Sequence, residues 1–240
     1  MNEPGPAHHT AVQPGGEPGL PWPTFVRAIR RLSHNVRNHL NTAGLEVSFA
    51  QEVTTDPEVG DSLAMLKQQL TKIRAELDHL LDRVVQPGLQ VSEVRADELF
   101  EELQRDVQNY LSTAAPVTWE LIAPGSMPVV ADLDLTFRVV RELLDNALRH
   151  RSNEARPIQV RGVGSASYFA LEIAEPKRDQ PAIGQWGKEP FTGTDPTRYG
   201  LGLWSAERWL LAMEGRLVRE YDADRRLLVT KVMLRTKVHP

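Results

Sequence analysis

The chain has 240 residues, of which 41% are hydrophobic and 25% are charged, and its formal net charge is -4. This slightly acidic balance disfavours a nucleic-acid partner, because phosphate contacts need a clustered basic excess. No cysteine is present, which excludes disulfides, thiol nucleophiles and thiolate metal sites. No segment reaches the roughly 20 apolar residues that cross a bilayer, and the N-terminus lacks a signal-peptide pattern. We therefore expect a cytoplasmic protein without a membrane span.

Residues 1–23 contain many prolines and glycines and show no apolar period. Such a composition cannot bury enough surface to offset the entropy of ordering. The sequence predicts a disordered tail over this range.

Residues 24–90 have the pattern of two amphipathic helices. Apolar residues recur at steps of three and four from Phe25 to Ala50, and again from Leu63 to Val84. The turn-forming residues of the range 54–60 predict a loop of about ten residues between the helices. The dipeptide at 87–88 is expected to end the second helix. The range therefore predicts an antiparallel helical hairpin.

A hairpin of two helices has too little interior to bury both apolar stripes. Pairing two copies into a four-helix bundle is the simplest solution and predicts a homodimer. The alternative is that both helices pack on the C-terminal half of the same chain.

Residues 91–240 mix strands and helices. Asp97 is a candidate N-cap, Gly215 is a candidate helix stop, and a hairpin turn is expected at 222–224. The predicted order places helices on one face of a mixed sheet, which is an α+β arrangement. The predicted strands are 90–94, 117–121, 158–163, 168–173, 217–221 and 227–234, and the predicted helices begin at 97, about 134 and about 201.

His34 lies on the first helix, about 180° away from the apolar stripe, and is therefore expected to be exposed. Arg30 and Asn38 lie one turn to either side of it on the same face. A phosphoryl group approaching His34 would meet a cation and an amide.

Four strings of the sequence resemble the motifs of two-component sensor histidine kinases. The string from Ser33 to Leu40 resembles the phosphoacceptor box, and the string from Glu142 to His150 resembles the N box. Residues 189–191 resemble the F box, and residues 200–203 resemble the second glycine box. The resemblance covers residues 24–235. It implies a dimeric four-helix bundle formed by the hairpin, followed by a Bergerat-type (GHKL) ATP-binding α/β sandwich with a mixed sheet.

The resemblance implies roles for individual residues. His34 is the expected phosphoacceptor, and Asn38 is expected to act beside it. Asn146 is the expected Mg²⁺ ligand, and Glu142, one turn earlier, is the acid expected to orient water around that metal. Arg149 stands where the family commonly has a lysine near the phosphates.

The remaining implied nucleotide contacts come from two loops. Glu175, at the end of a predicted strand, is expected to accept a hydrogen bond from adenine. Gly200, Gly202 and Leu203 belong to the second glycine box, whose bare backbone admits phosphates at the start of a helix. The implied cofactors are ATP and Mg²⁺.

The sequence also departs from the family pattern. Asn35 follows the phosphoacceptor and cannot act as a base there, unlike the acidic residue usual at this position. Lys177 and Arg178 occupy the positions where the first glycine box has glycines, and the segment between Phe191 and Gly200 is short for a nucleotide lid.

Three functions fit these strings. One is a histidine kinase that transfers the γ-phosphoryl group of ATP to His34 and then to an aspartate of a response-regulator receiver domain. Another is a dimeric histidine phosphotransferase or pseudokinase with a degenerate ATP lobe. The third is a response-regulator phosphatase or scaffold, in which Asn38 positions water against an acyl phosphate.

Overall fold

The computed structural model describes residues 22–85, 88–111, 117–181, 184, 186–190 and 200–237. The chain divides into two compact units, Met1–Leu81 and Asp82–Pro240. Most of the expected tail lies outside the described residues, but Trp22 and Pro23 are helical. Within the described ranges, no helix has both the length and the apolar character that crossing a bilayer requires.

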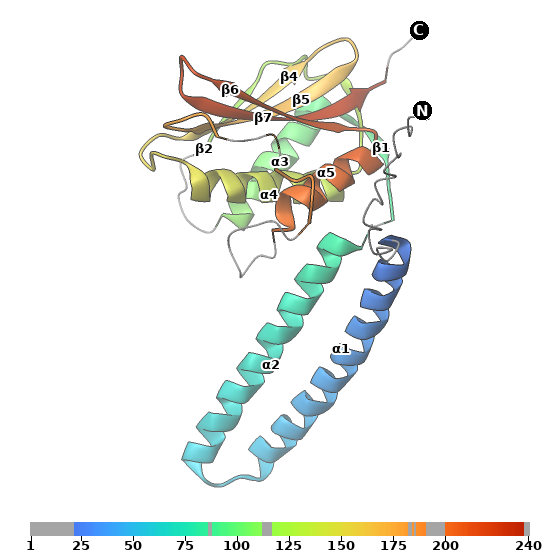
Figure 1. The fold of residues 1–240 in the computed structure, drawn as a ribbon, viewed down its shortest axis with the longest axis vertical. Coiled ribbons are helices and arrows are strands. Elements are labelled where there is room, and N and C mark those ends of the chain that lie inside the picture. Colours follow the sequence, from blue (N-terminus) through green and yellow to red (C-terminus); the bar gives the residue numbers. More distant parts are fainter. Residues whose placement is uncertain are drawn as a thin grey trace, which may run out of the picture. The chain divides into compact units, whose positions relative to one another are not determined.

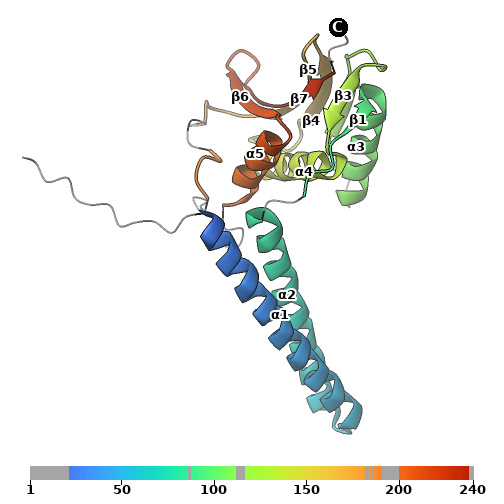
Figure 2. The ribbon, with the colours of Figure 1, turned by 90° about the vertical axis from the view of Figure 1, so that its right-hand side faces the viewer.

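The first unit is the expected helical hairpin. Helix α1 spans Trp22–Val53, and helix α2 runs back over Pro57–Val84. Figures 1 and 2 show the two helices side by side. Arg37 Nε donates to Asp78 Oδ1 at 2.7 Å, and Arg74 donates to Asn41 Oδ1 at 3.1 Å, so polar contacts fix the pairing of the helices.

The predicted ten-residue loop of the hairpin is wrong, because only residues 54–56 separate the helices. Asp56 Oδ1 accepts the backbone N–H of Glu58 at 2.9 Å and thereby caps α2. Pro57 takes the first helical position, where a missing N–H costs nothing. Gly60 lies inside the helix. The residues that the sequence analysis assigned to a loop are therefore a helix start.

The second unit is a seven-stranded mixed sheet with helices on one face (Figure 1). Its strand order is β1-β3-β7-β5-β4-β2, and β6 also pairs with β7. Only the β2–β4 pair is parallel among these strands. The elements are β1 Ser92–Arg95, α3 Ala96–Tyr110, β2 Val117–Leu121, β3 Pro128–Ala131, α4 Leu133–His150, β4 Ile158–Gly164, β5 Tyr168–Pro176, α5 Gly202–Ala212, β6 Arg216–Asp222 and β7 Leu227–Thr236.

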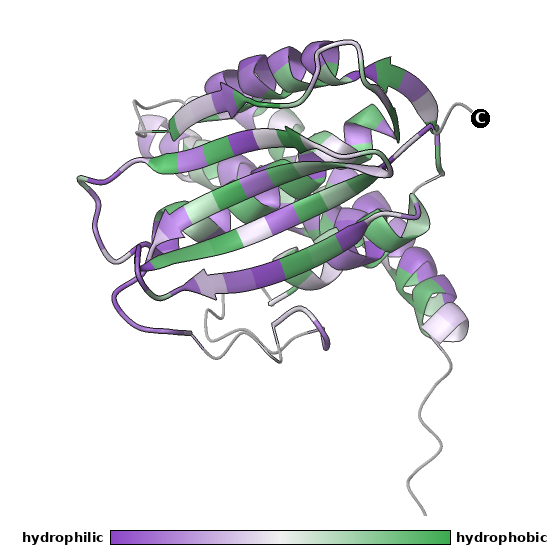
Figure 3. Ribbon diagram, turned by 90° about the horizontal axis from the view of Figure 1, so that it is seen from above, coloured by the Kyte–Doolittle hydropathy of each residue, from purple (hydrophilic) through white to green (hydrophobic). Residues whose placement is uncertain are grey.

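The core of this unit lies between the sheet and the three helices. Strands β4 and β7 alternate buried and more exposed residues, as expected for a sheet covered on one side. Figure 3 shows polar and apolar residues alternating along these strands. Ion pairs such as Lys231–Glu220 at 2.8 Å and Arg161–Glu120 at 3.2 Å join neighbouring strands. The hydrophobic side of the sheet therefore carries α4, which forms the floor of the site described below.

Three local predictions differ from the structure. Strand β3 is missing from the prediction, because a four-residue segment between a turn and a helix is too short to show a recognisable alternation. Asp97 is not the N-cap, since α3 begins at Ala96 and Asp97 lies in the first turn, paired with Arg95. After α5 the left-handed conformation falls on Glu214, at φ 59°, rather than on Gly215. Gly215 is needed instead because an added Cβ would lie 2.8 Å from the Met233 carbonyl oxygen.

Candidate functional site

His34 is exposed on α1, as the helical spacing predicts. The Asn38 side-chain amide lies 3.4 Å from His34 Nδ1, so the two residues form one polar group on this face. Arg30 is also exposed. Ser33, the preceding residue on α1, is only 2% exposed. The hairpin therefore presents an imidazole to solvent, with an amide in contact with one of its two nitrogens.

Glu142 and Asn146 are carried by α4. Asp132 caps this helix by accepting the backbone N–H of Leu135 at 3.1 Å. Leu143 and Leu144 are buried against the sheet, whereas Glu142 and Asn146, on a neighbouring face, are half-buried. The amphipathic pattern of α4 thus places both polar side chains at the edge of the core.

The second glycine box meets Glu142 at the start of α5. An added Cβ on Gly202 would lie 2.5 Å from Glu142 Oε2, so the glycine lets the Glu142 carboxylate lie close to the start of α5. Gly200 has φ +59°, a left-handed conformation that glycine adopts without strain. Leu203 packs against the hydrophobic core. The structure therefore brings together Glu142 and the glycine box, which lie 60 positions apart in the sequence.

Glu142 is already paired with a cation of this chain. Arg83, in the last turn of α2, belongs to the second unit, which begins at Asp82. Its Nε donates to Glu142 Oε1 at 3.0 Å, and its Nη2 contacts the same oxygen. The side chains of Arg83 and Glu142 are 6% and 15% exposed. The sequence analysis missed Arg83, because its partner Glu142 lies 59 positions away and no local pattern joins the two residues.

Glu175 is paired in the same way. It lies near the end of β5 and is only 3% exposed. Lys177 Nζ lies 3.0 Å from Glu175 Oε2 and also donates to the His150 carbonyl oxygen at 2.5 Å, at the C-terminus of α4. Burial raises the pKa of the Glu175 carboxyl to about 7, and the nearby Lys177 ammonium opposes that rise. The carboxylate expected to receive adenine therefore contacts an ammonium group.

The other two residues expected near the phosphates, Asn146 and Arg149, also lie on α4. The Asn146 amide makes no hydrogen bond to any residue that the structure describes. Arg149 lies 3.6 Å from Asp145, one turn earlier on the same helix. Phe191 and the expected lid lie outside the described residues.

These contacts test whether the residues fit ATP and Mg²⁺. Both expected carboxylates are engaged by internal cations, and Lys177 fills the position of a glycine that would admit the nucleotide. Over the described ranges, no three His, Asp or Glu side chains cluster in a way suited to a metal. Each carboxylate therefore meets a cation of this chain where the resemblance implies a contact to the nucleotide or its metal.

No protein-family model matches the sequence, and no curated protein matches it. Solved structures do match. Full-length ShkA, in complex with AMPPNP, aligns with a TM-score of 0.68 over 89% of this chain at 16% identity. This chain has the fold of a histidine kinase core. AdeS of Acinetobacter baumannii aligns over 85% of the chain at 17% identity (TM-score 0.50), and that alignment covers 96% of AdeS.

The catalytic domain of the histidine kinase ThkA, in a nucleotide-free form, aligns over 61% of this chain and 96% of its own length, at 16% identity and a TM-score of 0.51. The alignment with ShkA, by contrast, spans 47% of that protein. The histidine kinase fold thus includes the helical hairpin followed by the mixed-sheet domain, as predicted from the sequence. At these identities the likeness concerns the fold.

Proposed function

We propose that this protein is a dimeric histidine phosphotransferase that exchanges phosphoryl groups between His34 and aspartates of response-regulator receiver domains without using ATP. The observation that carries the proposal is the contrast between its two units. His34 is exposed and has an amide neighbour, whereas both carboxylates of the expected nucleotide site are paired with internal cations.

The energetic cost of opening the nucleotide site supports this choice. Separating a buried ion pair leaves an uncompensated charge and costs about 3 kcal/mol or more. A cost of about 3 kcal/mol raises a dissociation constant roughly 100-fold. Arg83 and Lys177 are 6% and 9% exposed, so water compensates little for either separation. Nucleotide affinity is therefore expected to be weak at best.

The chemistry at His34 needs one nucleophilic nitrogen. In the proposed reaction the Asn38 amide turns its oxygen to Nδ1–H, which leaves the lone pair of Nε2 facing solvent. Nε2 attacks the phosphorus of the aspartyl phosphate, the P–O bond to the carboxylate breaks, and the receiver aspartate leaves as a carboxylate. Asn35 cannot take up the Nδ1 proton. The ring keeps that proton and remains a good leaving group for transfer to the next aspartate.

The hairpin supports a dimer. Its helices expose large apolar side chains to solvent in the single chain, including Leu45, Phe49, Met65 and Ile73 at 47% to 73% exposure. A second copy would bury these side chains in a four-helix bundle. Exchange with response regulators would place this activity in the cytoplasm.

The decisive experiment is phosphoryl exchange with a receiver domain from the same genome. The receiver is phosphorylated with labelled acetyl phosphate, freed of that reagent and mixed with this protein. Label is expected on the wild-type protein but not on His34→Gln. It should be lost in acid and kept in base, because protonating a phosphohistidine releases its phosphoryl group. Label that persists on His34→Gln, or no label from any receiver of that genome, contradicts the proposal.

An ATP-driven kinase is the second candidate, and the nucleotide-facing part of the fold favours it. The Asn146 amide makes no hydrogen bond to the described residues, Gly200 has a left-handed conformation, and Gly202 lies close to Glu142. Incubation with labelled ATP and Mg²⁺ separates the two candidates. Labelling that depends on His34 and on Asn146 supports the kinase, whereas labelling from the receiver alone supports the phosphotransferase.

A further inference from the structure

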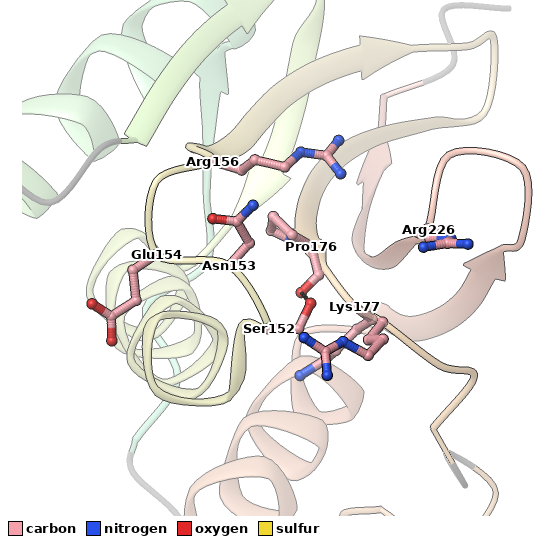
Figure 4. A pocket seen from close by; sticks show the side chains of 8 residues that line it. Ser152, Asn153, Glu154, Arg156, Pro176, Lys177 and Arg226 are labelled. Carbon is pink, nitrogen blue, oxygen red and sulfur yellow. Dashed lines mark hydrogen bonds between the residues drawn. The ribbon is translucent and has the colours of Figure 1, made fainter.

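A cationic pocket lies beside the end of β5 in the second unit. Its volume is about 440 Å³, and three separate segments of the chain line it (Figure 4). They are the loop after α4, the end of β5 and the β6–β7 turn. The lining residues are Ser152, Asn153, Glu154, Arg156, Pro176, Lys177, Arg178 and Arg226.

The charge of this pocket is uncompensated. Four of its lining residues are cations, and Glu154 is the only carboxylate among them. Lys177 lies 3.0 Å from Glu175, but Arg156, Arg178 and Arg226 form no ion pair within the described part of the chain. Figure 4 shows Glu154 pointing away from Arg156 and Arg226. The guanidinium groups are therefore available to an outside anion.

Backbone hydrogen bonds hold the three segments together. The Pro176 carbonyl oxygen accepts the Ser152 N–H at 2.9 Å and the Ser152 hydroxyl at 3.2 Å. The Lys177 N–H donates to the Arg226 carbonyl oxygen at 2.9 Å. Arg226 has φ 53°, a left-handed backbone conformation that is uncommon for residues other than glycine. The pocket is thus formed by anchored segments, and its arginines project from fixed backbone positions.

The lining also restricts the type of ligand. Arginine binds phosphate oxygens through two parallel N–H bonds, which favours phosphate over a diffuse negative charge. The Asn153 oxygen accepts the Ala155 N–H at 3.0 Å, so the amide NH₂ of Asn153 remains as a further donor. None of the described residues that line the pocket is aromatic and able to stack on a base. A compact ligand with several phosphate oxygens fits these donors better than a nucleoside.

We propose that this pocket binds a compact polyanion of the diphosphate class, either free or as the charged part of a small metabolite. The inference is independent of phosphoryl exchange at His34. Of the residues discussed for the expected nucleotide site, Lys177 and Arg178 line the pocket, whereas Glu142, Asn146 and the second glycine box do not.

The test is titration calorimetry of the full chain with inorganic diphosphate at low ionic strength, where exposed charges are least screened. Binding is expected, and Arg156→Gln and Arg226→Gln should each weaken it about tenfold or more, since a charge-assisted hydrogen bond contributes that much. Arg225→Gln is the matched control. Arg225 is the exposed neighbour of Arg226, lies 3.8 Å from Asp222 and does not line the pocket.

Several results would overturn the proposal. They are the absence of binding at millimolar diphosphate, an equal loss in Arg225→Gln, and sulfate binding as tightly as diphosphate. ADP binding more than tenfold tighter than diphosphate would show recognition of the base and would also contradict it. Loss of diphosphate binding in Asn146→Ala, with no change in Arg226→Gln, would assign the ligand to the nucleotide site. Circular dichroism of each variant checks that the fold is retained.

Discussion

Glu175 should make the stability of the mixed-sheet unit depend on pH. Its pKa is raised by burial from 4.5 to about 7, so between these values the folded chain binds a proton that the unfolded chain does not. The free energy of unfolding therefore falls as the pH rises through this window. This contribution is fully present below about pH 4.5 and lost above about pH 7. The substitution that removes it is Glu175→Gln.

The size of the effect follows from the two pKa values. From pH 5 to pH 8, a carboxyl with these values lowers the free energy of unfolding by about 2.5 kcal/mol. Glu175→Gln should lack this decrease. The difference in free energy of unfolding between the variant and the wild type should therefore shift by about 2.5 kcal/mol in favour of the variant as the pH rises from 5 to 8. The side chain is 3% exposed, so solvent screening does little to reduce the difference.

Urea unfolding at pH 5 and pH 8, followed by tryptophan fluorescence, measures this quantity. Trp119, Trp204 and Trp209 lie in the second unit, so the signal reports mainly on that unit. Lys177→Met is a second variant, and it should steepen the pH dependence because it removes the cation that opposes the raised pKa.

A Glu175→Gln protein whose stability changes with pH as much as the wild type would refute the reasoning. It would mean that the carboxylate is ionised at little cost in the fold, and that the Lys177 contact compensates fully for burial.

Three further predictions concern single contacts. Asp56→Ala should lower the stability of the hairpin by about 1 kcal/mol in thermal unfolding followed by circular dichroism, because it removes the cap of α2; an unchanged midpoint would contradict this. Gly215→Ala should destabilise the mixed-sheet unit by about 1–3 kcal/mol in urea unfolding, because the added Cβ would meet a backbone carbonyl. Gly60→Ala should instead stabilise helix α2 by about 1 kcal/mol, because no atom lies within 4 Å of the added Cβ. The reverse order would rule out the close approach. Arg83→Met should destabilise the chain by about 3 kcal/mol, and Glu142→Gln in the same background should restore part of that loss; additive losses would show that the two side chains are not coupled.

Much of the architecture is predictable from the sequence, because regular periods report burial directly. The stripes from Phe25 to Ala50 and from Leu63 to Val84 indicate both hairpin helices, and strand alternation locates β2, β4, β5 and β7. The predicted length of the hairpin loop is wrong for a local reason. Asp, Pro and Gly mark turns, but they also mark helix starts, and only the cap hydrogen bond of Asp56 distinguishes the two.

The site was predictable only in part, because its residue types are visible in a sequence and their partners are not. The strings around Glu142 and Gly202 suggest a shared site, and the structure brings these two residues together. The cations that neutralise the carboxylates depend on long-range packing. Arg83 lies 59 positions before Glu142, and no local pattern joins them. Lys177 stands out in the sequence as a departure from a glycine, but its contact with Glu175 appears only in the structure.

The two internal cations also limit how this lobe could change over evolutionary time. A substitution of Lys177 to glycine leaves Glu175 buried without a counter-charge, and loss of Arg83 leaves Glu142 in a similar state. Each single step toward an open nucleotide site thus lowers stability before any ligand binds to offset it. Because each cation is coupled to its carboxylate, opening this site without a loss of stability requires both members of a pair to change together. The two ion pairs therefore favour keeping the present arrangement of Glu142 and Glu175.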